Sequence, residues 1–257
     1  MAETYFMLRF SMASLAFALP LVLVYGNHLP LLHLPTVLPQ HSLSAYYHAM
    51  GINGSANPIW IGVYRNLFVG MLSAIGICLL AYKGYNDLED RLLNFAALAL
   101  WTVAYFPMGV PASCKPEVVG ACKEYTAAML IKMPNGAGLS VHLAGAIVFF
   151  ILLIATVWTT SKTTIQATRK ANDSRDIIDV DAEVRRKLKR WEDFYNLLRF
   201  AMLAPVAVFI LGNTILKTSW PSYMLYAEWS GIYVFATYWV IRTWEIRSIK
   251  YHSLGNL

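Results

Sequence analysis

Long apolar runs alternate with polar segments along the whole chain. Six runs lack acidic and basic residues almost completely, and they lie at about residues 8–25, 59–82, 92–110, 139–159, 199–216 and 222–241. A helix needs on the order of 20 apolar residues to cross about 30 Å of hydrocarbon, and most of these runs have that length. The pattern therefore predicts a single membrane domain, residues 1–257, that crosses the bilayer six times.

These spans are predicted to be helices. A strand of a membrane barrel would alternate apolar and polar residues over roughly ten positions, whereas residues 144–157 are almost uniformly apolar. In lipid, a helix satisfies its own backbone hydrogen bonds. No small-x-small cleavage site follows the first run, so we expect an uncleaved first span. The predicted fold class is an all-α, six-span transmembrane helical bundle.

The connections between the runs differ in length and character. Outer loops are predicted at residues 26–58 and 111–138, and a cytoplasmic connection at residues 160–198. Within that connection, apolar residues from Ala182 to Leu198 recur at helical spacing between basic residues. A basic amphipathic helix of this kind is suited to lying on the inner leaflet. We therefore expect an interfacial helix before span five.

Composition supports a membrane protein. The chain is 57% hydrophobic and only 14% charged, with a mean hydropathy of +0.47. A typical soluble domain is roughly 25% charged, so this chain has too few charges to cover a soluble surface. We expect the lipid bilayer itself to be its main partner.

Lysine and arginine are distributed unevenly between the two sets of connections. The set with both termini, the predicted tight turn Lys83–Arg91 and the connection counted through Arg199 carries 16 of them, and the other set carries 4. The positive-inside rule then places the N- and C-termini in the cytoplasm, in a multi-pass protein of the cell membrane. The isoelectric point near 9.2 follows from this bias. We interpret it as a topology signal facing anionic lipid, and expect no nucleic-acid partner.

Two cysteines lie in the second outer loop. Cys114 and Cys122 are close in sequence, and an oxidising outer compartment would allow them to pair. We predict a disulfide that stabilises this loop by roughly 2–3 kcal/mol. Cys78 lies within a span, where it is expected to pack as a small apolar residue.

Histidines gather at the outer face. Of 6 histidines, only His252 is predicted inside. His41, His48 and His142 are possible zinc ligands, because zinc sites need several imidazoles or carboxylates around one ion. No His-x3-His and no His-Glu-x-x-His spacing occurs, however, and an interfacial histidine is ordinarily an amphipathic residue with one wet edge.

Two charged residues lie inside apolar runs. Arg65 is in the second run and Glu228 in the sixth, at similar predicted depth below the outer face. Because an ion in hydrocarbon is costly, such residues face the bundle interior, a cavity or each other. One interpretation is an ion pair between two helices. The other is a polar cavity beneath the first outer loop, with Ser44, His48 and His142 near its mouth.

Part of the chain resembles known membrane proteins. Residues 42–48, 64–70, 79–85 and 94–97 read SLSAYYH, YRNLFVG, LLAYKGY and NFAA. Together they resemble a group of uncharacterised bacterial multi-span membrane proteins over about residues 40–160. The resemblance implies a membrane location and no agreed activity.

Ser44 and His48 also resemble one element of the alkaline ceramidase and adiponectin-receptor superfamily of membrane hydrolases. That superfamily holds zinc with a Ser-x3-His element, an Asp and a His-x3-His pair on its last helix. Here the last predicted span has Glu228 and no histidine, no Asp matches, and six spans replace seven. The resemblance implies a zinc hydrolase, but the sequence lacks the paired histidines of that zinc site.

Three functional hypotheses remain open, and the sequence does not decide whether the protein is an enzyme. In the first, the bundle binds a lipid, a small ligand or a partner subunit at its outer half. In the second, it is a zinc-dependent hydrolase of lipid amides or esters, in which zinc-bound water attacks near Ser44, His48, His142 and Glu228. In the third, it is a structural subunit of a membrane complex. The chain contains no Walker, dinucleotide-binding or Gly-x-Ser-x-Gly motif.

Overall fold

The computed structural model is mostly helical. It describes residues 2–29, 32, 34, 37, 39–49, 62–84, 86–108, 130–132, 138–163, 165–166, 182–215 and 222–254. The α-helices are α1 (Ala2–Tyr25), α2 (Val63–Ala81), α3 (Asp87–Tyr105), α5 (Val141–Thr160), α7 (Ala182–Ala201), α8 (Ala204–Thr214) and α9 (Tyr223–Leu254). Two short 3-10 helices are η1 (Gly26–His28) and η2 (Ser44–His48), and two short strands are β1 (Leu130–Lys132) and β2 (Gly138–Ser140).

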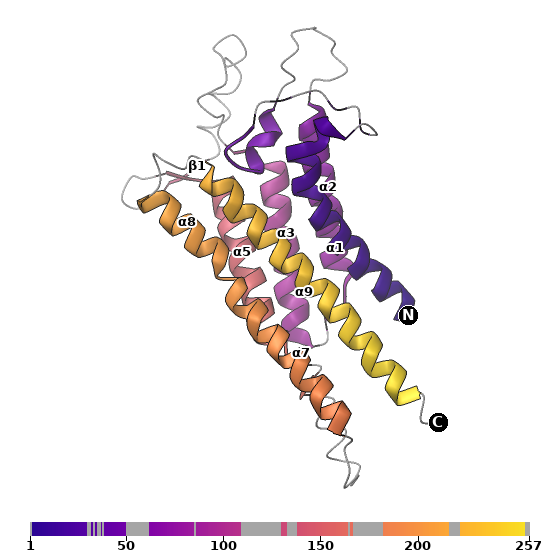
Figure 1. The fold of residues 1–257 in the computed structure, drawn as a ribbon. Coiled ribbons are helices and arrows are strands. Elements are labelled where there is room, and N and C mark those ends of the chain that lie inside the picture. Colours follow the sequence, from indigo (N-terminus) through magenta and orange to yellow (C-terminus); the bar gives the residue numbers. More distant parts are fainter. Residues whose placement is uncertain are drawn as a thin grey trace, which may run out of the picture.

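The helices pack side by side into one bundle (Figure 1). α1 packs against α2 and α9, α3 packs against α2 and α5, and α8 packs against α9. α5 also contacts α7 and α9, which closes the arrangement into a ring. Both termini lie at one end of the bundle, here called the terminus end, while η2 and the strands lie at the opposite, loop end (Figure 1).

Four helical stretches are both long and apolar enough to cross a membrane, among the residues that the structure describes. They are Phe6–His28, Val63–Ala81, Val141–Thr160 and Leu188–Thr214. α3 and α9 pack among these stretches, although their polar residues keep them outside this group. The structure therefore confirms helices of membrane-spanning length and composition in these four stretches, and they suggest a membrane-embedded protein.

α3 begins earlier than the apolar run that predicts it. The run starts at residue 92, whereas the helix starts at Asp87. The Asn86 side chain accepts a hydrogen bond from the Glu89 backbone N–H at 2.8 Å, and so caps the helix. Acidic residues in the first turn, Asp87, Glu89 and Asp90, are stabilised there by the helix dipole. The predicted tight turn is therefore partly helical.

The interfacial helix predicted before span five is not confirmed. α7 and α8 form one bent rod (Figure 1), interrupted just before Pro205, which has no N–H to donate to the preceding turn. The apolar side of α7, with Leu188, Tyr195 and Leu198, is buried against the bundle. α7 contacts both α5 and α9. Leu188, Tyr195 and Leu198 therefore serve helix packing, whereas Phe194, Leu197 and Phe200 on the same helix are exposed.

A short antiparallel pair of strands adds to the predicted all-α fold. Leu130 pairs with Ser140 and Lys132 with Gly138. Ser140 then caps α5, because its side chain accepts a hydrogen bond from the Leu143 N–H at 3.1 Å. The pair therefore leads directly into α5. Cys114 and Cys122, the predicted disulfide partners, lie outside the described residues.

Candidate functional site

A cavity of about 50 Å³ lies inside the ring of helices. A single water needs roughly 10–15 Å³ by the same kind of measure, so this space holds several water-sized groups. Apolar side chains from five helices line it, including Met12, Leu72, Leu100, Phe149 and Ile232. We call it the central cavity. Its lining is apolar almost throughout, so its contents are expected to be apolar as well.

Glu228 and Ser44 are the polar exceptions near the loop end of the central cavity. One Glu228 carboxylate oxygen accepts a hydrogen bond from the Leu43 backbone N–H at 2.6 Å. The other accepts from the Ser44 hydroxyl at 3.3 Å. The structure thus brings together two residues that the sequence singled out, although 184 positions separate them.

The segment from His41 to His48 covers this end of the cavity, and we call it the cap. The backbone N–H of Leu225, in the first turn of α9, donates to the His41 carbonyl at 2.9 Å. Tyr46, within the cap, is buried, and its ring is tilted against that of Tyr64 with 6.0 Å between the ring centroids. Burial raises the pKa of the Tyr46 hydroxyl, which therefore stays protonated. The cap is held mainly by α9 and α2.

His48 and His142 both bind the end of α3. His48 Nε2–H donates to the Met108 carbonyl at 2.9 Å, and His142 Nδ1–H donates to the Phe106 carbonyl at 2.8 Å. The last carbonyls of a helix lack partners within the helix, and His142 satisfies the one at Phe106, the C-cap of α3. His48 satisfies a carbonyl just beyond that helix end. Both histidines lie at the loop end, as the sequence predicts for the outer face.

No group of three histidine, cysteine, aspartate or glutamate side chains could hold a metal within the described part of the chain. His41 is exposed, and it joins His48 and His142 in no such group. Two of the three predicted zinc ligands, His48 and His142, are therefore held by hydrogen bonds, but the described residues contain no complete set of zinc ligands. Two imidazoles alone do not complete a zinc site, which takes at least three protein ligands.

Arg65 and Glu228 form no ion pair with each other in the described structure. The Arg65 side chain is exposed and folds back beside Gly62, just before α2 begins. Glu228 instead meets only neutral donors, Leu43 and Ser44. The sequence left open an ion pair or a cavity, and the arrangement matches the second, with the Glu228 carboxylate in the cavity lining.

Trp239 lines the opposite end of the central cavity. Its side chain is fully buried and packs edge-on against Tyr82 at 4.7 Å. The indole N–H has no hydrogen-bond partner in the described structure. A water or another acceptor inside the cavity could satisfy it, because a buried donor left alone costs about 1–3 kcal/mol.

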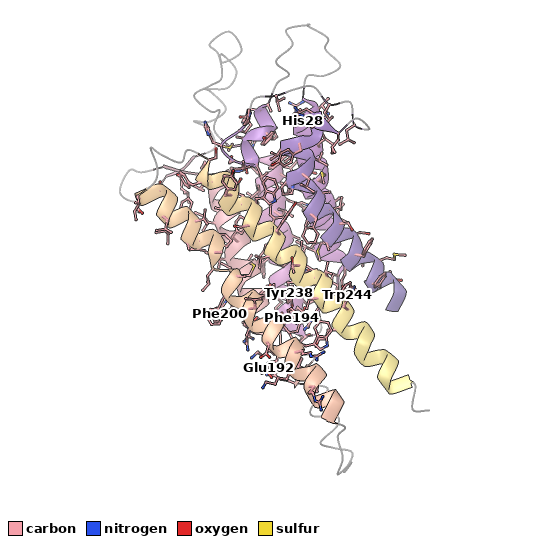
Figure 2. All side chains as sticks on the ribbon, viewed as in Figure 1. His28, Glu192, Phe194, Phe200, Tyr238 and Trp244 are labelled. Carbon is pink, nitrogen blue, oxygen red and sulfur yellow. The ribbon has the colours of Figure 1, made fainter. Side chains whose placement is uncertain are left out.

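Sequence reasoning missed a second polar cluster, at the terminus end. Arg242 Nη2 lies 3.4 Å from Glu89 Oε2 and donates to the Thr163 hydroxyl at 2.8 Å. Arg242 Nη1 lies 3.9 Å from Glu245, which also accepts a hydrogen bond from the Tyr195 hydroxyl. Figure 2 shows Tyr238 in this half of the bundle, far from His28 at the loop end. The Tyr238 hydroxyl shares a 3.3 Å hydrogen bond with the Thr160 hydroxyl.

This second cluster joins α3, α5, α7 and α9. Arg242, Glu89 and Glu245 are fully buried, and the two acids each have an arginine partner. From the sequence alone, Arg242 is one of the basic residues that set the topology, and Glu89 is part of the turn at Lys83–Arg91. The spacing of Arg242 and Glu245, three residues apart on a helix, was the available signal, because such residues share a face.

Comparisons with known proteins add no assignment. No family model, curated protein or solved structure matches the chain. The two resemblances stated above therefore remain predictions, and the function must be argued from the site itself.

Proposed function

We propose that this protein is a six-span membrane protein that binds a single-chain apolar or amphiphilic molecule in the central cavity, below the cap. The observation that carries the proposal is the cavity itself, an apolar space inside the helix ring with a carboxylate and a hydroxyl at one end. Ligand sites are usually concave and mostly apolar, with a few polar groups that orient the ligand. The central cavity has this composition.

The six-span topology is part of the proposal. Four stretches meet the length and hydropathy needed for a span, and α3 and α9 lie parallel to them in the bundle. Both termini lie at the same end of the bundle (Figure 1), which an even number of crossings requires. The excess of lysine and arginine on the segments of that end supports a cytoplasmic location for both termini in the cell membrane.

The lining supports an elongated ligand. The cavity extends along α9 from Glu228 to Trp239. These residues are 11 positions apart (239 − 228), which corresponds to about 16 Å along a helix at about 1.5 Å per residue. Each methylene group removed from water contributes about 0.8 kcal/mol, so a chain that fills part of this length binds measurably.

Photolabelling tests this function. The protein is placed in lipid nanodiscs with a short-chain alcohol, about four carbons long to match the cavity volume, that carries a diazirine at the end of its chain. We expect saturable labelling of cavity residues on α9 and α5, which an excess of the same alcohol without the diazirine suppresses. Labelling of the lipid-facing side of α8, where Ile210 and Ile215 are exposed, should rise without saturation.

Narrowing the cavity provides the matched control. Ala16 and Ala236 line the cavity on α1 and α9, whereas Ala207 on α8 is exposed. Ala16→Leu and Ala236→Leu, tested separately, should remove the saturable component, and Ala207→Leu should retain it. The proposal is wrong if folded Ala16→Leu and Ala236→Leu label like the unmodified protein, or if no saturable labelling occurs at all.

One observation also favours the zinc-dependent hydrolase. Histidines that bind metals usually donate their second ring nitrogen to a carbonyl or carboxylate, and His48 and His142 both have such a carbonyl partner. Metal analysis of the purified protein tests this alternative. Stoichiometric zinc that is lost in His48→Ala and His142→Ala would support it, and its absence would leave the binding function alone.

A further inference from the structure

The acids of this protein are neutralised at one end of the bundle and not at the other. At the terminus end, Glu89 and Glu245 each meet Arg242 within 3.9 Å. At the loop end, Glu228 meets the Leu43 N–H and both the hydroxyl and the backbone N–H of Ser44, and no basic side chain pairs with it among the described residues. Within the part of the chain that the structure describes, Glu228 is therefore a partly buried carboxylate without a counter-charge.

No other described arginine or lysine replaces the missing partner. Arg65 is the basic residue nearest in depth, and it is exposed on the outer side of α2. Arg242 is 14 positions further along α9 (242 − 228), about 21 Å away at about 1.5 Å per residue, and is already paired with acids. An ion removed from water needs a partner of opposite charge to offset its lost hydration.

From this asymmetry we infer that the ligand of the central cavity is a cationic single-chain amphiphile, whose positive head pairs with Glu228. The inference deepens the proposed binding function and rests on it. Both Glu228 oxygens retain acceptor capacity beside their present partners, because a carboxylate has about four lone-pair sites. The apolar chain then extends along the cavity toward Trp239.

A ligand with an anionic head group at the other end of the cavity, beside Trp239, is less favourable. Trp239 offers one neutral N–H donor, which a water or a carbonyl oxygen can satisfy. A ligand carboxylate at that end would add a third buried acid beside Glu89 and Glu245, whose arginine is already shared between them. An uncompensated charge outweighs a single unmade neutral hydrogen bond. The head group is therefore placed at Glu228.

Three photoprobes test this inference in nanodiscs of zwitterionic lipid. They share one short alkyl chain, about four carbons long to match the cavity volume, with a terminal diazirine, and differ only in the head, which is a primary ammonium, a hydroxyl or a carboxylate. We expect the ammonium probe to half-saturate cavity labelling at a concentration about tenfold or more below that of the alcohol, which corresponds to about 1.4 kcal/mol. The carboxylate probe should bind most weakly.

Glu228→Gln identifies the partner of the head group. This variant keeps an oxygen that can accept from Leu43, so the cap should stay in place. The preference for the ammonium probe over the alcohol should fall to within about twofold, compared with the tenfold or more that is expected for the unmodified protein. Glu192→Gln, which removes a partly exposed acid near the terminus end (Figure 2), serves as the matched control and should keep the preference.

The outcomes separate the two proposals. Equal half-saturation by all three heads, or an ammonium preference that persists in Glu228→Gln, would overturn the cationic ligand and leave the cavity function intact. Saturable labelling by none of the probes would overturn the cavity function itself. If Glu228→Gln does not accumulate as folded protein, the comparison of the three heads in the unmodified protein decides the inference by itself.

Discussion

Arg242 and Glu89 meet at 3.4 Å between α9 and α3, and neither side chain has any exposed surface. They are 153 positions apart in sequence. The guanidinium also reaches Ser161 and Thr163 just beyond α5. One side chain therefore connects three helical segments at the terminus end.

Removing one partner of this pair should destabilise the protein strongly. Glu89→Ala leaves part of the Arg242 charge uncompensated, and breaking a buried pair in this way typically costs about 3–5 kcal/mol. Thermal unfolding in a fixed detergent measures the effect. Glu192→Ala, which removes the partly exposed partner of Lys162, should cost at most about 1 kcal/mol. Equal losses of thermal stability in the two variants would contradict a structural role for the buried pair of Arg242 and Glu89.

Glu228→Ala should loosen the cap. The Leu43 N–H loses its acceptor, so its hydrogen exchange with deuterated solvent should accelerate by about tenfold or more, as expected for the loss of about 1.4 kcal/mol of protection. Exchange at Leu43 to Ala45, followed by mass spectrometry, measures this change. Arg65→Ala should leave exchange there unchanged. Protection that survives in Glu228→Ala would show that other contacts hold the cap.

Replacing a glycine by alanine should have opposite effects on stability at Gly212 and at Gly70. A methyl group at Gly212 would overlap the Tyr223 side chain, because α8 and α9 approach closely there. Gly212→Ala should lower the unfolding free energy by about 1–3 kcal/mol. A methyl group at Gly70 in α2 meets nothing within 4 Å, so Gly70→Ala should raise stability by about 0.5–1 kcal/mol. Melting temperatures of the two variants that shift in the same direction would contradict this packing.

Alkylation tests the disulfide predicted between Cys114 and Cys122. Without reductant, mass spectrometry of the denatured protein should find one alkylated thiol, that of Cys78, which is a free cysteine in the structure. After reduction, all 3 cysteines should react. Replacing Cys114 and Cys122 by serine should cost roughly 2–3 kcal/mol of stability. Three reactive thiols without reductant would exclude the bond.

Local sequence predicts the helices well because membrane helices depend on local composition. The run at residues 139–159 and helix α5, Val141–Thr160, agree within two residues at each end. The apolar run that starts at residue 92 predicts the start of α3 too late, because the helix begins at Asp87. The acidic residues of its first turn are part of the helix, which Asn86 caps. Apolarity alone does not mark that start.

The candidate site is predicted only in part. The sequence places Ser44, His48, His142 and Glu228 near one end of the bundle, and the structure joins Ser44 to Glu228. It separates Arg65 from Glu228, because Arg65 is on the outward side of α2. Depth in the membrane follows from position along a run. The direction a side chain faces depends on which helices pack beside it.

The sequence by itself determined where the long apolar helices form, because enough apolar residues in one run make a helix that only lipid or a protein core can surround. Only the tertiary structure decided which charges are neutralised. Arg242 finds Glu89 across 153 positions, whereas Glu228 finds only neutral donors beside an apolar cavity. The physical reason is that a counter-charge acts over a few ångströms in space, and the packing of distant helices sets those distances.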